Sequence, residues 1–125
     1  MNSLGRSDEA LKYYREAQRL SPESPQSLAK LAWFLATHAN PKLRNGVEAL
    51  RLAERACQLT GQNDPLALSA LAAAQAETGR FNQAAQTVQK AIDLAAAGGQ
   101  NAMATAFQEL RQSYQQGRPH REGQP

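Results

Sequence analysis

His38 and Cys57 are the two residues of this sequence whose side chains could together form a nucleophile and its general base. A cysteine attacks as the thiolate, and an imidazole within hydrogen-bond reach can remove the thiol proton. The two residues fall on different predicted helices, however, and Cys57 directly follows Ala56 on an apolar face. We therefore interpret both residues as structural and predict no catalytic residue.

Other motifs for catalysis, cofactors and metals are absent from the sequence. It contains no P-loop, no glycine-rich dinucleotide turn and no HExxH zinc motif. A single cysteine excludes an intrachain disulfide and a multi-cysteine metal site. The other histidine, His120, lies in a polar C-terminal tail. The sequence therefore predicts a protein that is not an enzyme and binds no cofactor or metal.

The charge pattern argues against nucleic acid as a partner. Fourteen Lys and Arg residues stand against eleven Asp and Glu residues, which gives a formal net charge of +3. Nucleic-acid binding needs a basic stripe rather than a small surplus. Glu48 and Glu54 interrupt the densest basic cluster, whose members are Lys42, Arg44, Arg51 and Arg55.

The sequence also carries no signal for membrane insertion. Its N-terminus, MNSLGRSDEA, lacks the apolar core of a signal peptide. No uninterrupted apolar run approaches the length that crosses a bilayer. We therefore expect no direct membrane insertion and a cytoplasmic location, unless the chain is one piece of a longer protein.

The elements that must position these residues are predicted to be helices throughout. The chain of 125 residues is rich in alanine, the best helix former, and poor in aromatic residues. Gly- and Pro-containing breaks divide it into segments with apolar residues at three- and four-residue intervals. This pattern predicts an all-α fold with helices near 7–20, 25–38, 46–60, 65–78, 81–96 and 100–116.

Helix ends carry specific turn residues. Ser24-Pro25 and Asp64-Pro65 each offer an N-cap side chain followed by proline at the first helical position. Gly79 stands where a left-handed residue would end one helix before the next begins. The last nine residues, GRPHREGQP, are polar and rich in Gly and Pro, which predicts a frayed tail.

The helices repeat in pairs. Three of them share one spacing of small and large residues. In each, an alanine (Ala10, Ala49 or Ala84) is followed ten positions later by a leucine. Two others share the pattern Leu-x-x-Leu-Ala, beginning at Leu28 and at Leu68. A single helical hairpin cannot bury its own apolar face, so repeated units stack and cover one another.

This arrangement resembles the tetratricopeptide-repeat family, whose unit is a helix–turn–helix of about 34 residues. The resemblance covers roughly residues 4–97 and implies a right-handed α-solenoid of antiparallel helix pairs. We expect one domain over 4–116 and a flexible tail over 117–125. The parts of the domain are the second helix of a truncated repeat (4–22), an extended repeat (25–60), a second repeat (65–96) and a capping helix (100–116).

The extended repeat departs from the family spacing because the stretch ANPKLRNG lengthens its internal turn. The string from Leu31 to Thr60 is similar to extended units near the C-termini of bacterial tetratricopeptide proteins. Such proteins are often fused to glycosyltransferase, membrane or signalling segments.

The family resemblance implies non-enzymatic binding of a protein or peptide partner, of unknown identity, on the concave surface. A peptide or partner helix would lie in a groove formed by the first helix of each hairpin. The residues expected to contact it are Ala29, Trp33, Ala70, Ala73, Met103 and Phe107. The Lys and Asn pairs with which some family members bind C-terminal carboxylates are missing, because the matching positions hold Ala29, Trp33 and Ala70. An apolar partner is therefore expected.

Trp33 has a second interpretation, in which it folds under the long 39–46 turn as part of a small separate core. The first helix also leaves alternatives open, because it lacks the helix that would normally cover Tyr13 and Tyr14. Either the chain was cut from a longer array, or the exposed surface pairs with another copy and forms a homodimer. The alternative functions are therefore a self-association module, or a regulatory or substrate-presenting repeat segment of a larger enzyme such as a bacterial glycosyltransferase.

Overall fold

Six α-helices joined by turns make up the computed structural model, which describes residues 3–122. Each predicted helical segment is present, and the ends differ from prediction by one residue or none except at the first helix, which begins at Ser3 rather than at residue 7. Within the described residues no strand forms, so the predicted all-α fold is confirmed. The helices are α1 (Ser3–Leu20), α2 (Pro25–Thr37), α3 (Gly46–Leu59), α4 (Pro65–Glu77), α5 (Phe81–Ala97) and α6 (Asn101–Gln115).

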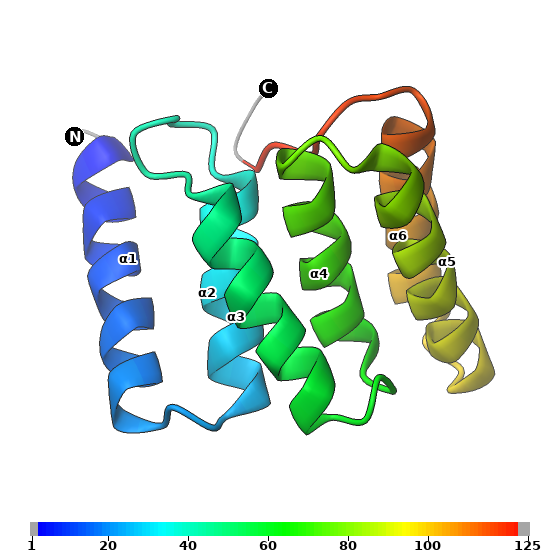
Figure 1. The fold of residues 1–125 in the computed structure, drawn as a ribbon, viewed down its shortest axis with the longest axis horizontal. Coiled ribbons are helices and arrows are strands. Elements are labelled where there is room, and N and C mark those ends of the chain that lie inside the picture. Colours follow the sequence, from blue (N-terminus) through cyan, green and yellow to red (C-terminus); the bar gives the residue numbers. More distant parts are fainter. Residues whose placement is uncertain (1–2, 123–125) are drawn as a thin grey trace.

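Successive helices run antiparallel and stand side by side along the long axis of the molecule (Figure 1). Each helix packs against the next one in the chain, and α2 also packs directly against α4. In Figure 1, α2 lies behind α3 and α6 behind α5. The helices α2 and α4, which are not consecutive, therefore lie next to each other.

The predicted caps explain where α2 and α4 begin and where α4 ends. The Ser24 hydroxyl accepts a hydrogen bond from the backbone N–H of Ser27 at 3.3 Å, and the Asp64 carboxylate accepts one from that of Leu66 at 3.1 Å. Gly79 has φ of 83°, a left-handed conformation in which residues with a side chain are strained. The backbone N–H of the next residue then bonds the carbonyl of Gln75 at 2.8 Å, which closes the helix end.

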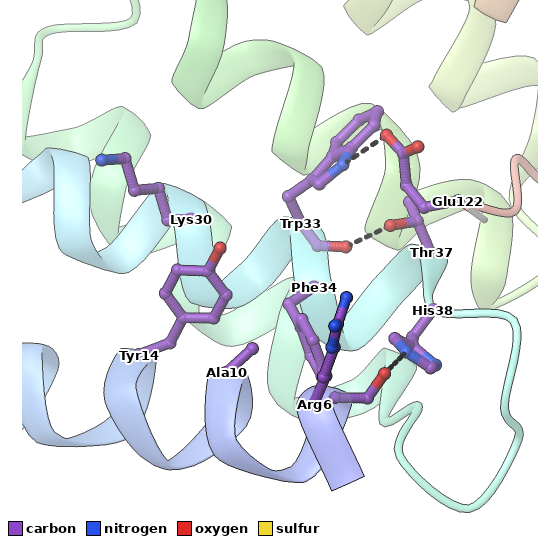
Figure 2. Close-up of a pocket in the computed structure, with 10 residues that line it drawn as sticks. Arg6, Ala10, Tyr14, Lys30, Trp33, Phe34, Thr37, His38 and Glu122 are labelled. Atoms are coloured by element: carbon purple, nitrogen blue, oxygen red, sulfur yellow. Dashed lines mark hydrogen bonds between the residues drawn. The ribbon is translucent and has the colours of Figure 1, made fainter. Parts of the chain in front are cut away.

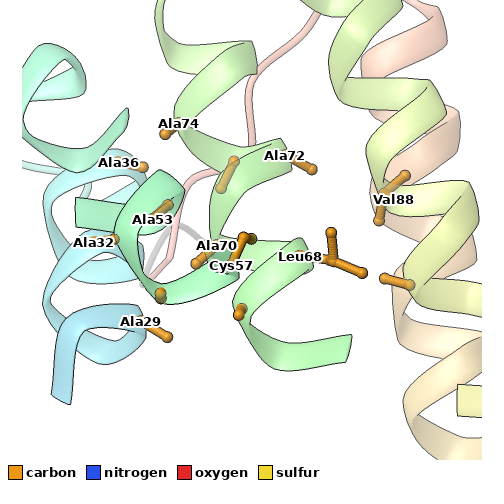
Figure 3. Close-up of a cluster of buried hydrophobic side chains, with 14 of the residues drawn as sticks. Ala29, Ala32, Ala36, Ala53, Cys57, Leu68, Ala70, Ala72, Ala74 and Val88 are labelled. Atoms are coloured by element: carbon orange, nitrogen blue, oxygen red, sulfur yellow. The ribbon is translucent and has the colours of Figure 1, made fainter. Parts of the chain in front are cut away.

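Small side chains allow the helices to pack closely. Ala49, Ala53, Ala84 and Ala91 are fully buried, as the repeated alanine spacing predicts. The most completely covered helix is α4, whose buried residues point in all directions around its axis (Figure 3). A helix that is apolar all round is buried by its neighbours. Here α2, α3 and α5 surround α4.

The first helix is held differently, because none of its described side chains is fully buried. The Tyr14 ring packs against Phe34 with ring centroids 5.7 Å apart. The Arg15 guanidinium donates two hydrogen bonds to Glu48 in the first turn of α3, at 2.8 and 3.1 Å. This contact holds the pKa of Glu48 below its usual range. Aromatic and polar contacts thus replace a deep apolar face in α1.

The C-terminal tail differs from the prediction. Residues 118–122, here called the C-terminal segment, return from α6 across the ends of α4 and α2 (Figure 1). The backbone N–H of Glu122 donates to the carbonyl of Thr37 at 2.8 Å. The sequence predicts a flexible tail here, and in the structure the charged side chains of this segment contact residues on distant helices. Residues 123–125 lie outside the described part of the chain.

We expect Ala84→Leu to destabilise the fold by about 1–3 kcal/mol, because Ala84 is fully buried and three added carbons must displace packed neighbours. Ala106→Leu is the matched control, since Ala106 is exposed on α6. Thermal unfolding followed by circular dichroism compares the two variants. Equal unfolding temperatures would show that the alanine spacing does not set the helix-to-helix distance.

Candidate partner-binding site

The six residues predicted to contact a partner do not share one exposed surface. Trp33 and Met103 are partly buried, whereas Ala29 and Phe107 are almost fully buried. Ala70 and Ala73 expose only 1% and 2% of their surface. Their prediction as groove-lining residues is therefore wrong. In an isolated hairpin their face of α4 would be open, but here neighbouring helices cover it.

An open groove does lie between α2, α4 and α6. Its volume is about 330 Å³, and three of the predicted residues line it: Ala29, Trp33 and Phe107. Leu66 lies at its edge with 54% of its surface exposed. We call this cavity the Phe107 groove, and its lining is Tyr14, Gln26, Ala29, Lys30, Trp33, Asp64, Leu66, Ser69 and Phe107. The walls are mainly apolar, and Lys30 and Asp64 add one charge of each sign.

A second cavity, of about 410 Å³, separates α1 from α2. Trp33, Tyr14 and Lys30 line both cavities, so the side chain of Trp33 lies at their boundary (Figure 2). Across this second cavity the imidazole of His38 contacts the Ser7 hydroxyl at 2.8 Å. The backbone N–H of Asn40 donates to Nδ1 of the same ring at 2.9 Å. A neutral imidazole that accepts at Nδ1 carries its proton on Nε2, so His38 donates to Ser7.

The structure places Trp33 beneath the C-terminal segment rather than beneath the 39–46 turn. Its indole N–H donates to the Glu122 carboxylate at 3.0 Å (Figure 2). Its ring centroid lies 5.5 Å from that of His120. The backbone carbonyl of Thr37, one turn after Trp33 in α2, accepts a hydrogen bond from the backbone N–H of Glu122. Sequence reasoning missed these contacts because Trp33 and Glu122 are separated by 89 positions and no repeat pattern links them.

Glu77, the last residue of α4, is a second contact point of the C-terminal segment. One of its carboxylate oxygens lies 2.6 Å from the Arg121 guanidinium, and the other accepts a hydrogen bond from Arg44 at 3.2 Å. All three side chains expose less than a fifth of their surface. Gly46 leaves room for Glu77, since a Cβ there would lie 2.9 Å from Glu77 Cγ.

Arg44 also fixes the extended turn of the first full hairpin. Its guanidinium donates to the carbonyls of His38 and Ala39 at 2.8 and 3.1 Å. The long turn that departs from the family spacing therefore brings a cation to the end of α4. Nothing in the local sequence around Glu77 points to this ion cluster.

The helical stack and this geometry can be compared with known proteins. The family model described as tetratricopeptide repeat matches residues 2–24, which include α1 and the turn after it. The match supports a tetratricopeptide repeat over these residues. No curated protein and no solved structure is significantly similar to the chain. The similarity to bacterial C-terminal repeat regions stays a prediction.

Tetratricopeptide repeats generally act as non-catalytic modules of protein–protein interaction, which fits the expected class of function. Among the described residues, no helix is long and apolar enough to cross a membrane. The same residues contain no group of three or more His, Cys, Asp or Glu side chains that could hold a metal ion. The cytoplasmic location stays a prediction.

The chemistry considered for His38 and Cys57 has no support in this all-α fold. Both ring nitrogens of His38 are engaged, by Ser7 and by the backbone of Asn40. Cys57 exposes 1% of its surface. Burial, reinforced by the negative charge of Asp64, raises the pKa of the Cys57 thiol to about 11. The thiol is therefore neutral near pH 7, when catalysis would need the thiolate.

We expect the buried Cys57 thiol to make stability fall at alkaline pH. Its pKa is raised on folding from 9.0 to about 11, so the unfolded chain loses this proton first as the pH rises. The contribution is complete below pH 9 and is lost as the pH rises towards 11. Urea unfolding between pH 8 and 11 should show a smaller alkaline loss for Cys57→Ala than for the wild type. Parallel curves for the two proteins would contradict a raised thiol pKa.

Proposed function

We propose that this chain is a non-enzymatic interaction module that binds a partner polypeptide in the Phe107 groove. The observation that carries the proposal is the open apolar cavity between α2, α4 and α6, with Leu66 exposed at its edge. The general role of tetratricopeptide repeats in protein–protein interaction supports the same conclusion.

The groove has the chemistry of an interaction surface. Partly buried Trp33 and Tyr14 stand beside exposed Leu66, and aromatic side chains are enriched among the residues that dominate binding energy. Filling the groove would remove this apolar surface from water, at roughly 25 cal/mol per Å² before association costs. Lys30 and Asp64 lie among the lining residues and would orient a partner that carries charges of both signs. An apolar helix or extended segment fits this lining.

Met103 is kept in the proposed site as a neighbour rather than a lining residue. It lies one helical turn before Phe107 on α6, and it is partly buried. Its flexible thioether can adapt to a partner that extends past the groove. The fully covered residues Ala70 and Ala73 are not part of this proposal.

Selection of peptides from a random library on the immobilised chain tests the proposal. We expect Leu66→Arg to lower the affinity for the selected peptides by about tenfold or more, because the substitution places a charge at the edge of the apolar groove. Val47→Arg is the matched control, since Val47 is 77% exposed on α3 and does not line the groove. Affinity is measured by isothermal titration calorimetry. Peptides that bind both variants as tightly as the wild type would place the site elsewhere.

Self-association through α1 is a second candidate function. Among the residues of this helix whose burial is described (6–20), Tyr13 and Leu20 are the exposed large hydrophobic ones. The main packing contact of the helix is with α2. A homodimer would cover this surface, as would further repeats in a longer protein, including the larger enzyme considered above. Light scattering from 1 μM to 100 μM, on the order of cellular to crystallographic concentrations, distinguishes a dimer from a monomer. A strict monomer over this range would exclude the dimer.

A further inference from the structure

The C-terminal segment (residues 118–122) lies against the chain in the way that a bound peptide would. It is extended, and Glu122 forms a parallel β-bridge with His38 at the end of α2. None of its residues is buried, so no apolar side chain anchors it. Its contacts are instead backbone hydrogen bonds, ion pairs and the indole of Trp33. A segment held by polar contacts, with no fully buried side chain of its own, can leave its site without unfolding the helices.

The ends of α2 and α4 select for an arginine. The last carbonyls of a helix lack partners within the helix, and the helix dipole places partial negative charge there. Neither α2 nor α4 has a basic residue in its last turn. Arg44 of the extended turn reaches Glu77 and the His38 carbonyl, and Arg121 adds a second cation. The Arg121 guanidinium lies 3.4 Å from the Ala36 carbonyl and 2.6 Å from the Glu77 carboxylate.

The residue after the arginine meets a different requirement. The Trp33 indole N–H is a donor only, so it binds an acceptor and takes the Glu122 carboxylate. The backbone N–H of Glu122 meanwhile bonds the Thr37 carbonyl, which fixes the position of the segment along α2. The order of the two side chains is thereby set: the cation lies towards α4 and the acid towards Trp33.

We propose that Trp33, Thr37 and Glu77 form a receptor site for an extended segment with arginine directly followed by an acidic residue. The chain's own residues 118–122 occupy this site as an intramolecular ligand, and a partner carrying the same pair displaces them. The proposal rests on the proposed function, because Trp33 also lines the Phe107 groove and one partner would contact both. Occupation by the chain's own segment lowers the apparent affinity for that partner.

The test uses the full chain, the double variant Arg121→Ala/Glu122→Ala and a capped synthetic peptide, RPHRE, that copies residues 118–122. Trp33 is the only tryptophan, so its fluorescence reports on the site. Arg118→Ala is the matched control within the segment, since the Arg118 guanidinium donates to Gln116 of the same tail. A second peptide, RPHER, exchanges the order of the arginine and the acid.

We expect the double variant to emit at longer wavelength than the wild type, because Trp33 loses its cover. Added RPHRE should reverse this shift with saturation, whereas RPHER should not. By isothermal titration calorimetry, the wild type should need about tenfold more RPHRE than the double variant if its own segment occupies the site for roughly nine-tenths of the time. The Arg118→Ala variant should behave as the wild type does.

The proposal is overturned if the double variant has wild-type emission, if RPHRE fails to reverse the shift, or if both proteins bind RPHRE equally. Circular dichroism checks that the double variant is helical. If it is not, Glu122→Ala alone gives the same comparison, since that side chain is about half exposed and Glu77 keeps both arginines.

The library peptides separate this proposal from the proposed function. If peptides bind in a Leu66-dependent manner but RPHRE does not bind the double variant, the receptor site is wrong and the groove remains. If RPHRE binds and no library peptide depends on Leu66, the groove is wrong, and the receptor site accounts for binding on its own.

Discussion

Close packing around α4 is the constraint on which the rest of the structure depends. Six of the eight buried residues of this helix are alanines, so α2, α3 and α5 can all approach its backbone. Alanine contributes little buried area for each residue, but it favours the helix and lets neighbouring helices exclude water over a long contact. The same packing fixes α2 beside α4, and the two helices then present their ends together. The Phe107 groove and the site of the C-terminal segment both lie along this pair.

The inner surface beside α2 and α4 divides into two chemically different halves. Near the helix starts, the Phe107 groove is apolar and open. Near the helix ends, the Glu77 carboxylate and the terminal carbonyls of α2 form a surface of negative charge and partial negative charge. The guanidinium groups of Arg44 and Arg121 cover this surface. Trp33 stands between the halves, with its ring against the cavities and its N–H towards a carboxylate. One polypeptide partner could therefore contact both halves through this residue.

This arrangement gives the extended turn of the first full hairpin a structural role. It is long enough to place Arg44 between the carbonyls at the end of α2 and Glu77 at the end of α4. Gly46 then starts α3 close to Glu77, at a distance that a larger residue would not allow. Partly buried charges need partners because desolvation is costly. Arg44 and Arg121 both pair with Glu77, so Glu77 keeps one partner when the other arginine is removed.

Local patterns in the sequence determined the helices, their caps and the repeat, because propensity, capping and apolar spacing act within a few residues. They also placed Ala29, Trp33 and Phe107 on surfaces that line one groove. Only the tertiary structure decided that Ala70 and Ala73 are covered, because their exposure depends on the helices around α4 rather than on their position in a hairpin. The path of residues 118–122 could not be predicted from the sequence either, since a polar tail rich in Gly and Pro has no periodic pattern. Its position follows from charges and unpaired carbonyls that come together only after the helices have stacked.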